Sequence, residues 1–367
     1  MPYLADVTPS VLAAMGISGF DNRIPLPGNA SGACVLLIDG LGAELLDTFS
    51  ADAPVLAGLH RQTLQVGFPS TTVAGLAAIG TGCRSGQHGM VGMTFRLPGA
   101  GVVNALRWRP HPWGEDLRDE VLPERVQPTP TTFERAASAG VAVSVISGAE
   151  FTGSGLTRAV LRGGRYVGVY GLGDLAARVR EAVAAGGFCY GYHADLDLLG
   201  HLYGPGSTAW RMQLRQVDRL VESVVEGLPP GALLAVVADH GMVTVVDTVD
   251  VDECEPLLDG VSAIGGEARA RHVYAAEGAA DAVLAAWRET LGGHAWVVSR
   301  DEAIEAGWFG ERVDDKVRPR IGDVVAAARG SAAMVRRTVE PIESSLIGQH
   351  GSLTTAEQLI PLLIAHG

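Results

Sequence analysis

Two uninterrupted apolar runs, each ending in an aspartate, constrain the fold of this chain more than any other feature. They are ACVLLID at residues 33–39 and ALLAVVAD at residues 232–239. Such runs are typical of strands that are buried on both faces in a parallel sheet. Other strand and helix patterns alternate along the chain, with strands at 62–69, 141–147 and 187–195 and helices at 42–49, 72–80, 131–140, 172–185 and 207–227. We therefore predict an α/β fold with a mainly parallel central sheet flanked by helices.

The pattern changes in residues 250–345, which we predict to be an inserted, smaller cap. Its strands and helices are short and lack strong core runs, with strands expected at 271–276 and 295–299 and helices at 279–291 and 301–306. Residues 1–249 and 346–367 then form the catalytic core. Within the core, residues 90–130 are rich in Gly, Pro, Trp and Arg, and we expect an irregular segment that covers the site. A loop and a terminal helix are expected over residues 349–366.

Composition excludes several classes of protein. The 367 residues carry 41 acidic and 28 basic side chains, for a net charge of −13, and no basic stripe is visible. A partner that is a nucleic acid polymer is therefore not expected. No apolar stretch approaches 18 residues, and the N-terminus has no basic region before an apolar run, so we expect a cytoplasmic protein without a membrane partner. Four widely spaced cysteines give neither a zinc knuckle nor a disulfide scaffold.

Candidate metal ligands follow the two strongest strands. Asp39 closes the first, and Asp239 and His240 close the second. Each alone is more typical of a helix cap or a hydrogen-bonded pair. A carboxylate directly after a buried strand nevertheless needs a cation or several donors, and ligands of parallel sheets bind at this edge.

A third candidate is the pair Asp197 and His201, which would face the same direction on a helical turn. A carboxylate with an imidazole suits zinc, manganese or iron, although an ordinary surface pair has the same spacing. Asp195 is a competing ligand with a less suitable spacing. His350 lies between glycines in a loop, where its side chain is free to point into a cleft or into solvent.

A hydroxyl at a helix start completes the inventory. Ser70, Thr71 and Thr72 precede a small, apolar helical segment, where free backbone N–H groups favour anions. Beside a divalent cation such a hydroxyl becomes an alkoxide nucleophile, whereas otherwise it is a plain cap. Three carboxylates, three histidines and one hydroxyl form the inventory of a two-metal hydrolase.

The order of these motifs resembles the alkaline phosphatase superfamily. An Asp after the first strand, a Thr before a Thr-Gly pair, Asp-x-x-x-His-x-x-Gly-Pro, Asp-His-Gly-Met and a late His-Gly occur in that order between residue 35 and about residue 363. Within the superfamily the chain is most similar to nucleotide pyrophosphatases/phosphodiesterases and the related phosphonoacetate hydrolases.

The resemblance implies a role for each candidate. The nucleophile of that family lies ten residues before the Gly of the Thr-Gly pair, which here indicates Thr72. Two divalent metal ions, usually zinc, are implied. One would be held by Asp197, His201 and His350, and the other by Asp39, Asp239, His240 and Thr72. The implied reaction is hydrolysis of phosphate diesters or nucleotide pyrophosphates through a phospho-threonine intermediate, on a small phosphorylated molecule such as a nucleotide.

One departure from the family concerns the substrate. The phosphodiesterases carry an Asn that contacts phosphate where this chain has Met93, and methionine donates no hydrogen bond. The backbone N–H of Thr72 or the side chain of Asn104 would have to replace it, or the substrate is a phosphomonoester or phosphonate. A terminal anionic group would then need cations such as Arg84, Arg96, Arg107 or Arg109.

Two further possibilities stay open. Trp108 or Trp113 could stack on a nucleobase, although packing within the cover is the simpler role for either ring. A metal-binding protein without turnover is a remote alternative to an enzyme. The sequence leaves the metal ion and the oligomeric state open, because similar Asp and His ligands bind zinc, manganese and iron.

Overall fold

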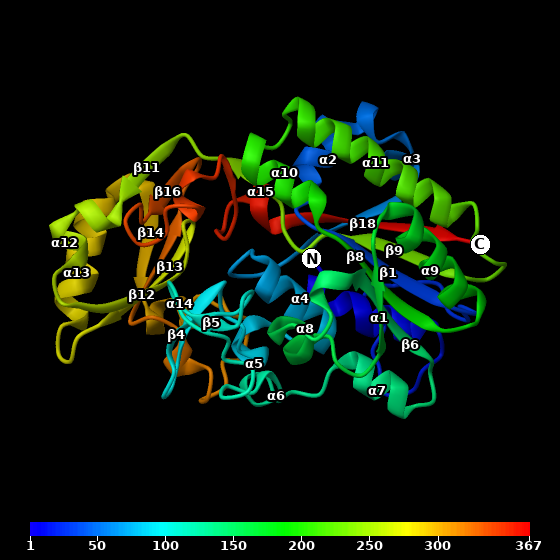
Figure 1. The fold of residues 1–367 in the computed structure, drawn as a ribbon, viewed down its shortest axis with the longest axis horizontal. Helices are drawn as coiled ribbons and strands as arrows, with labels where there is room; N and C mark the ends of the chain where they lie inside the picture. Colours follow the sequence, from blue (N-terminus) through cyan, green and yellow to red (C-terminus); the bar gives the residue numbers. More distant parts are fainter.

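The central sheet has seven strands in the order β2–β18–β9–β1–β8–β6–β7 in the computed structural model, which describes residues 1–367 (Figure 1). The strands are β1 (Ala33–Ile38), β2 (His60–Gln65), β6 (Val143–Gly148), β7 (Arg165–Val169), β8 (Phe188–His193), β9 (Leu233–Val237) and β18 (Leu359–His366). Five neighbouring strands, β9 to β7, run parallel, and every residue of β1 and β9 is buried. The predicted α/β class with a mainly parallel sheet is confirmed.

The C-terminal segment differs from the prediction. Only Thr355–Gln358 is helical (α15), and the chain then enters β18, which pairs antiparallel with both β9 and β2. The expected terminal helix is therefore wrong. The apolar run Leu359–Ala365 fits a buried strand as well as a helix, and the open position between β9 and β2 decided between them.

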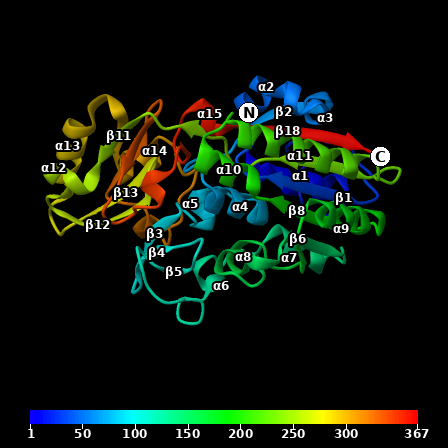
Figure 2. The same cartoon turned by 45° about the horizontal axis from the view of Figure 1, so that its top comes forward.

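Helices cover both faces of the sheet (Figures 1 and 2). One face carries α3, α9, α10 and α11, and the other carries α1, α4, α7 and α8, with contacts among the members of each set. Their bounds are α1 (Val7–Ala14), α2 (Ala43–Thr48), α3 (Pro54–Gly58), α4 (Thr72–Thr81), α5 (Ser85–His88), α6 (Pro123–Val126), α7 (Thr132–Ser138), α8 (Gly155–Val160), α9 (Leu172–Ala184), α10 (Asp195–Tyr203) and α11 (Thr208–Val225). None of the helices is both long and apolar enough to cross a membrane.

The cover segment is more regular than predicted. Three short antiparallel strands form a small sheet within residues 90–130, namely β3 (Thr94–Leu97), β4 (Gly101–Asn104) and β5 (Arg109–Pro110). The expectation of an irregular segment is wrong for this part. Strands of two to four residues are too short to show a period of two in the sequence, and their turn residues dominate the composition.

A second sheet lies within the proposed cap, residues 250–345. Its antiparallel order is β12–β13–β15–β14, and it packs on α13 around a separate apolar cluster that includes Val273 and Trp287. The predicted strands and helices are present as β13 (Ala270–Ala275), β14 (Ala295–Ser299), α13 (Ala280–Leu291) and α14 (Arg300–Glu305). This region also contains β12 (Val261–Glu267), β15 (Val324–Ala328) and α12 (Glu255–Leu258). Two further strand pairs lie at its ends, namely β11 (Asp247–Asp250) with β16 (Ala332–Val335) and β10 (Val243–Thr244) with β17 (Gly348–Gln349).

Candidate active site

Three adjacent strands deliver most of the predicted ligands to one edge of the central sheet. Asp39 follows β1, Asp239 and His240 follow β9, and α10 begins two residues after β8. Because β8, β1 and β9 are parallel neighbours, their carboxyl ends meet. Asp39 is 2% exposed and Asp239 and His240 are 0% exposed, so the charges at this edge are buried.

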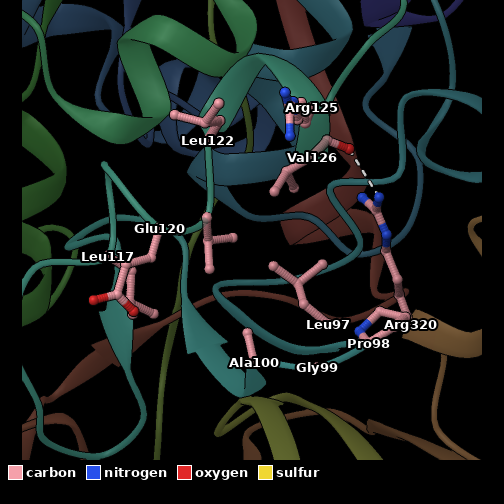
Figure 3. Close-up of a pocket in the computed structure, with 11 residues that line it drawn as sticks. Leu97, Pro98, Gly99, Ala100, Leu117, Glu120, Leu122, Arg125, Val126 and Arg320 are labelled. Atoms are coloured by element: carbon pink, nitrogen blue, oxygen red, sulfur yellow. Dashed lines mark hydrogen bonds between the residues drawn. The ribbon is translucent and has the colours of Figure 1, made fainter.

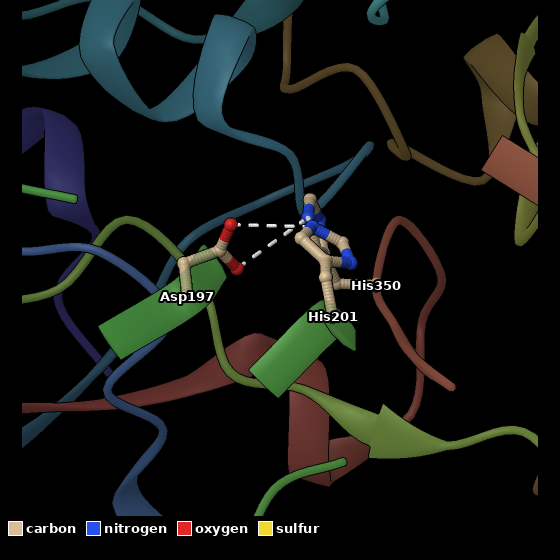
Figure 4. Close-up of side chains that lie close together, drawn as sticks. All are labelled: Asp197, His201 and His350. Carbon is tan, nitrogen blue, oxygen red and sulfur yellow. Dashed lines mark hydrogen bonds and ion pairs between the residues drawn. The ribbon is translucent and has the colours of Figure 1, made fainter. Parts of the chain in front are cut away.

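The first cluster contains Asp197, His201 and His350 (Figure 4). His201 Nε2 lies 3.2 Å from Asp197 Oδ2, which confirms that the two side chains share one face of α10. His350 comes from the loop after β17, and its Nε2 lies 3.3 Å from His201 Nε2 and 3.8 Å from Asp197 Oδ1. Asp195 is exposed and does not join the cluster.

The second cluster lies directly beside the first and contains Asp39, Asp239, His240 and Thr72. His240 Nε2 is 3.3 Å from Asp39 Oδ1, 3.7 Å from Asp239 Oδ2 and 3.2 Å from Thr72 Oγ1. The His240 and His350 rings stack with centroids 3.5 Å apart. The structure therefore brings the seven residues that the sequence singled out into one continuous group.

Backbone carbonyls orient the three imidazoles. The Nδ1 atoms of His201, His240 and His350 donate to the carbonyls of Gly348 (2.7 Å), Gly241 (3.0 Å) and Ser70 (2.9 Å), respectively. A donating Nδ1 leaves the Nε2 lone pair of a neutral imidazole free, and all three Nε2 atoms face the clusters. This outer contact is the arrangement that fixes the tautomer of histidines that bind metal ions.

Burial and mutual repulsion dominate the electrostatics of this site. Burial raises the pKa of Asp39 well above its usual range, and the Asp239 and Asp197 carboxylates raise it further. Burial also raises the pKa of Asp239. Burial lowers the pKa of His350 well below its usual range, and the adjacent His240 lowers it further. His201 outweighs the effect of burial at Asp197 and lowers the pKa of that carboxyl. The protein alone therefore leaves the negative charge of Asp39 and Asp239 poorly compensated.

The donor set fits metal ions. One oxygen on each of Asp39, Asp197 and Asp239 is buried and makes no hydrogen bond. Two groups of three ligand atoms, Asp197–His201–His350 and Asp39–Asp197–His240, each lie within 4.8 Å of one another. Buried carboxylate oxygens without donors are expected where a cation completes their coordination. Carboxylates and imidazoles are ligands for zinc, manganese and iron.

Thr72 is the first residue of α4, and its hydroxyl is half-buried at the start of this ten-residue helix. Thr71 precedes it as a buried cap position without a side-chain hydrogen bond. One turn later, a Cβ on Gly75 would lie 2.5 Å from Asp239 Cβ. Glycine at this position lets α4 approach Asp239 closely, which places Thr72 beside His240.

Sequence reasoning missed the residues that support the ligands. The Tyr192 hydroxyl donates a hydrogen bond to Asp39 Oδ2. Ser70 exchanges hydrogen bonds with the Gly351 segment, and the Glu357 carboxylate accepts from Ser352 N–H while it pairs with Arg269 of the cap. Tyr192 lies near the end of a predicted strand, and this position was the only feature of the local sequence that could have indicated its role. The contacts of Ser70 with Gly351 and of Arg269 with Glu357 join residues far apart in the sequence.

The predicted substrate residues are dispersed. Trp108 is 1% exposed and packs against Gly155, so its ring has no open face for a base. The Arg84 guanidinium stacks on Tyr3, 3.5 Å from the ring centroid, and lies beyond the opposite end of α4 from Thr72. Asn104 pairs with Thr94, the residue after Met93, and its side-chain oxygen accepts from Arg107 N–H.

The arginines considered for a terminal anionic group form no cluster. Arg96 donates to Ser262 and stacks on Tyr274, and Arg107 approaches Glu343 at 4.0 Å. Arg109 is exposed on β5. None of these side chains belongs to the ligand clusters described above. His88 is buried, and its Nδ1 accepts a hydrogen bond from Met90 N–H.

The sequence matches the type I phosphodiesterase / nucleotide pyrophosphatase family over residues 33–353. The chain belongs to this family. It is therefore a hydrolase of the alkaline phosphatase superfamily, a metal-dependent group, which agrees with the resemblance of its motifs. A search of curated protein sequences found no match.

Solved structures share the fold at low sequence identity. Murine ectonucleotide pyrophosphatase/phosphodiesterase 5 superposes with a TM-score of 0.69 at 17% identity, covering 90% of this chain and 87% of the murine chain. Phosphonoacetate hydrolase from Sinorhizobium meliloti 1021, in complex with phosphonoformate, gives a TM-score of 0.65 at 19% identity, covering 91% and 89%. These two neighbours carry out different hydrolytic reactions on one fold, so the substrate must be argued from the site.

Proposed function

We propose that this protein is a two-metal phosphodiesterase or nucleotide pyrophosphatase that uses Thr72 as its nucleophile. The observation that carries the proposal is the position of the Thr72 hydroxyl, at a helix start and 3.2 Å from His240 Nε2, beside three buried carboxylates with unpartnered oxygens. A hydroxyl beside so many metal-type ligands supports a role for Thr72 in attack on phosphorus. An inactive threonine-to-alanine variant of the murine neighbour has been solved with AMP, which is consistent with a threonine nucleophile.

Two divalent ions would be held by the residues that the motifs indicate. Asp197, His201 and His350, which lie together, would bind one ion. Asp39, Asp239, His240 and Thr72 would bind the other, as the family motifs imply, and His240 contacts each of the other three. We propose zinc, with manganese or iron as the alternatives that suit the same ligands. When bound, the ions would neutralise the phosphate and lower the pKa of the Thr72 hydroxyl.

The chain's own residues then account for a double displacement. The Thr72 oxygen loses its proton and forms a bond to phosphorus, while the bond to the leaving oxygen breaks and that oxygen takes up a proton, which gives a phospho-threonine. Water next forms a bond to phosphorus, and one of its protons passes to the Thr72 oxygen as the bond between that oxygen and phosphorus breaks. The free N–H groups at the start of α4 stabilise the negative oxygens in both steps. His240 contacts the Thr72 hydroxyl, and the Tyr192 hydroxyl donates to Asp39. These two contacts hold Thr72 and Asp39 in place.

Asn104 is the proposed replacement for the phosphate-binding Asn at position 93. The Met93 backbone N–H already donates to Glu267 Oε2, so it offers no free donor. Asn104 lies across the β3–β4 ladder from Thr94, and Ala105 N–H donates to Met93 O. The side-chain oxygen of Asn104 accepts from the Arg107 backbone N–H. The side-chain NH₂ group of Asn104 is therefore available as a donor to phosphate.

A cavity beside the ligands is the proposed site for the rest of the substrate. It measures about 280 Å³ and lies at the carboxyl ends of β6, β7 and β8. Tyr192 joins it to the metal ligands, because this residue lines the cavity and bonds Asp39. Phe151 meets Tyr192 edge to face at 6.1 Å. Aromatic walls at this place suit the planar base of a small nucleotide.

A phosphomonoesterase or phosphonate hydrolase is the second candidate, and Met93 is the observation that favours it. The phosphonoacetate hydrolase neighbour shows that the fold supports such chemistry. A monoester or phosphonate carries an additional anionic group, and the dispersal of Arg84, Arg96, Arg107 and Arg109 leaves no cationic cluster to receive it. The diester is therefore the better proposal.

Paired turnover tests these proposals. Zinc-loaded protein should hydrolyse bis-p-nitrophenyl phosphate at least tenfold faster than p-nitrophenyl phosphate, and Thr72→Ala should abolish both activities while retaining metal. Preference for the monoester would transfer the assignment to the second candidate. Full activity of Thr72→Ala would exclude Thr72 as the nucleophile. Two bound metal ions with no turnover of either ester would favour a non-catalytic role.

A further inference from the structure

A second cavity lies in the cover, away from the metal ligands. It measures about 670 Å³ and is formed between the tip of the β3–β4 hairpin and residues 117–126 (Figure 3). Six of its eleven lining residues are hydrophobic, namely Leu97, Ala100, Leu117, Val121, Leu122 and Val126. It shares no lining residue with the catalytic clusters or with the cavity at Tyr192.

One buried cation lines this cavity without a counter-ion. Arg320 is 6% exposed, and its guanidinium donates to the backbone oxygens of Gly89 and Val126, both at 2.8 Å. Its Nε makes no hydrogen bond, and no carboxylate lies within ion-pair distance. Burial lowers the pKa of Arg320 to about 10, so it remains charged at neutral pH. A buried charge is normally paired, and this one is not.

Other buried arginines of the chain show what is missing. Arg269 and Arg271 are each 0% exposed, and each forms a two-pronged pair with a buried glutamate. In contrast, Arg320 has only carbonyl oxygens and the Phe95 ring, whose centroid is 5.8 Å away. Carbonyl oxygens satisfy hydrogen bonds but carry no net charge to balance a guanidinium.

The rim of the cavity adds no compensating pair. Arg125 and Glu120 also line it, both are exposed, and neither forms an ion pair. The three ionisable side chains of the cavity therefore carry one net positive charge. A ligand complementary to this lining has one negative charge and an apolar body.

We propose that this cavity binds a small amphiphilic carboxylate, whose head group pairs with Arg320 and whose hydrocarbon chain contacts the leucine and valine walls. A guanidinium presents N–H groups in a fork that matches a carboxylate. The apolar chain lies between the β3–β4 hairpin and residues 117–126. This site is independent of the hydrolytic reaction.

Calorimetric titration of the zinc-loaded protein with octanoate tests the proposal, with octanamide as the uncharged probe of the same shape. Octanoate should bind with one-to-one stoichiometry, and octanamide at least tenfold more weakly. Ala100→Trp, which fills the cavity from the hairpin, should weaken octanoate binding at least tenfold. Arg320→Gln should do the same, whereas Arg219→Gln, on the exposed face of α11, should leave it unchanged.

Three results would overturn the proposal. Absence of octanoate binding would remove the site. Equal affinity for octanamide would show that Arg320 plays no part. Unchanged octanoate affinity in Ala100→Trp would place the ligand elsewhere, including at the zinc ions. If Arg320→Gln does not fold, the octanamide comparison and Ala100→Trp still decide, because neither perturbs the Arg320 contacts with Gly89 and Val126.

Discussion

Buried charges occur in two regions of this molecule with opposite arrangements. At the edge of the central sheet, Asp39, Asp197 and Asp239 crowd together, and one oxygen of each has no hydrogen-bond partner. Where the cap meets the rest of the chain, the Glu340 carboxylate receives two bonds from Arg271 and lies 3.0 Å from His111. The first arrangement needs a cation that the protein does not supply, whereas the second is complete. Whether a buried carboxylate has a cationic partner within the protein therefore distinguishes a candidate binding site from a structural ion pair.

The largest effect is expected at the incomplete cluster. Asp239→Asn should lower kcat/KM at least about 1,000-fold, since a metal ligand and its charge are lost together. Metal analysis should find one ion fewer. The metal-free variant should unfold at the same temperature as metal-free wild type or higher, because a repelling carboxylate is gone. Retained activity with full metal content would show that the crowding of these aspartates has another cause.

The complete pair should respond in the opposite way. Glu340→Gln should lower the free energy of unfolding by about 3 kcal/mol, because Arg271 is left buried and unpaired. Arg271 outweighs the effect of burial and lowers the pKa of Glu340 to about 2. This contribution to stability should therefore be present above pH 4.5 and decline as the pH falls toward 2. Denaturant unfolding measures both effects, and a loss independent of pH would argue against the ion pair.

Glu267 lies between these two extremes and sharpens the comparison. Its Oε2 accepts from Met93 N–H, its Oε1 has no partner, and burial raises its pKa to about 8. Between pH 4.5 and 8 the unfolded chain has lost the proton that the folded chain keeps. The stability of wild type relative to Glu267→Gln should therefore fall by about 1.4 kcal/mol per pH unit across this window, and level off above pH 8.

Denaturant unfolding of both proteins at several pH values provides the measurement for Glu267. A constant difference between the two proteins would mean that the carboxyl ionises normally.

The smallest effect is expected for Tyr192, which supports the candidate metal ligand Asp39. Tyr192→Phe removes the hydroxyl that donates to Asp39 Oδ2 and should weaken metal binding about tenfold, as outer contacts of metal ligands do. Competition with a chelator gives the affinity. Tyr166→Phe, which removes a hydroxyl bonded to the Gly148 carbonyl on the same sheet, is the control and should keep wild-type affinity. Equal affinities in all three proteins would assign Tyr192 to packing alone.

Much of the fold was predictable because long apolar runs are strong signals. The runs at 33–39 and 232–239 became β1 and β9, and the spacing of Asp197 and His201 placed both on one face of α10. Short elements were not predictable. β3 to β5 are too brief to show a period, and the run that became β18 suits either a strand or a helix until its neighbours are known.

The candidate site was predictable in its residues but not in its supports. The seven candidate positions are marked by strand ends, a helix start and motif spacing. The carbonyls of Gly348 and Ser70, which orient His201 and His350, carry no signal because every residue has a carbonyl. The burial of Trp108 was equally unpredictable, since the sequence around an aromatic residue is similar whether its ring packs in the interior or binds a ligand.

The sequence by itself determined the chemical inventory and the family: three aspartates, three histidines and a threonine, each attached to a strand end, a helix or a glycine-rich loop. Only the tertiary structure decided that these groups share one buried edge. Parallel pairing of β8, β1 and β9 aligns their carboxyl ends, and β18 fills the remaining place beside β9. The physical reason is that local pattern fixes which face a side chain takes, whereas the distance between residues far apart in the chain depends on how the strands pair and the helices pack.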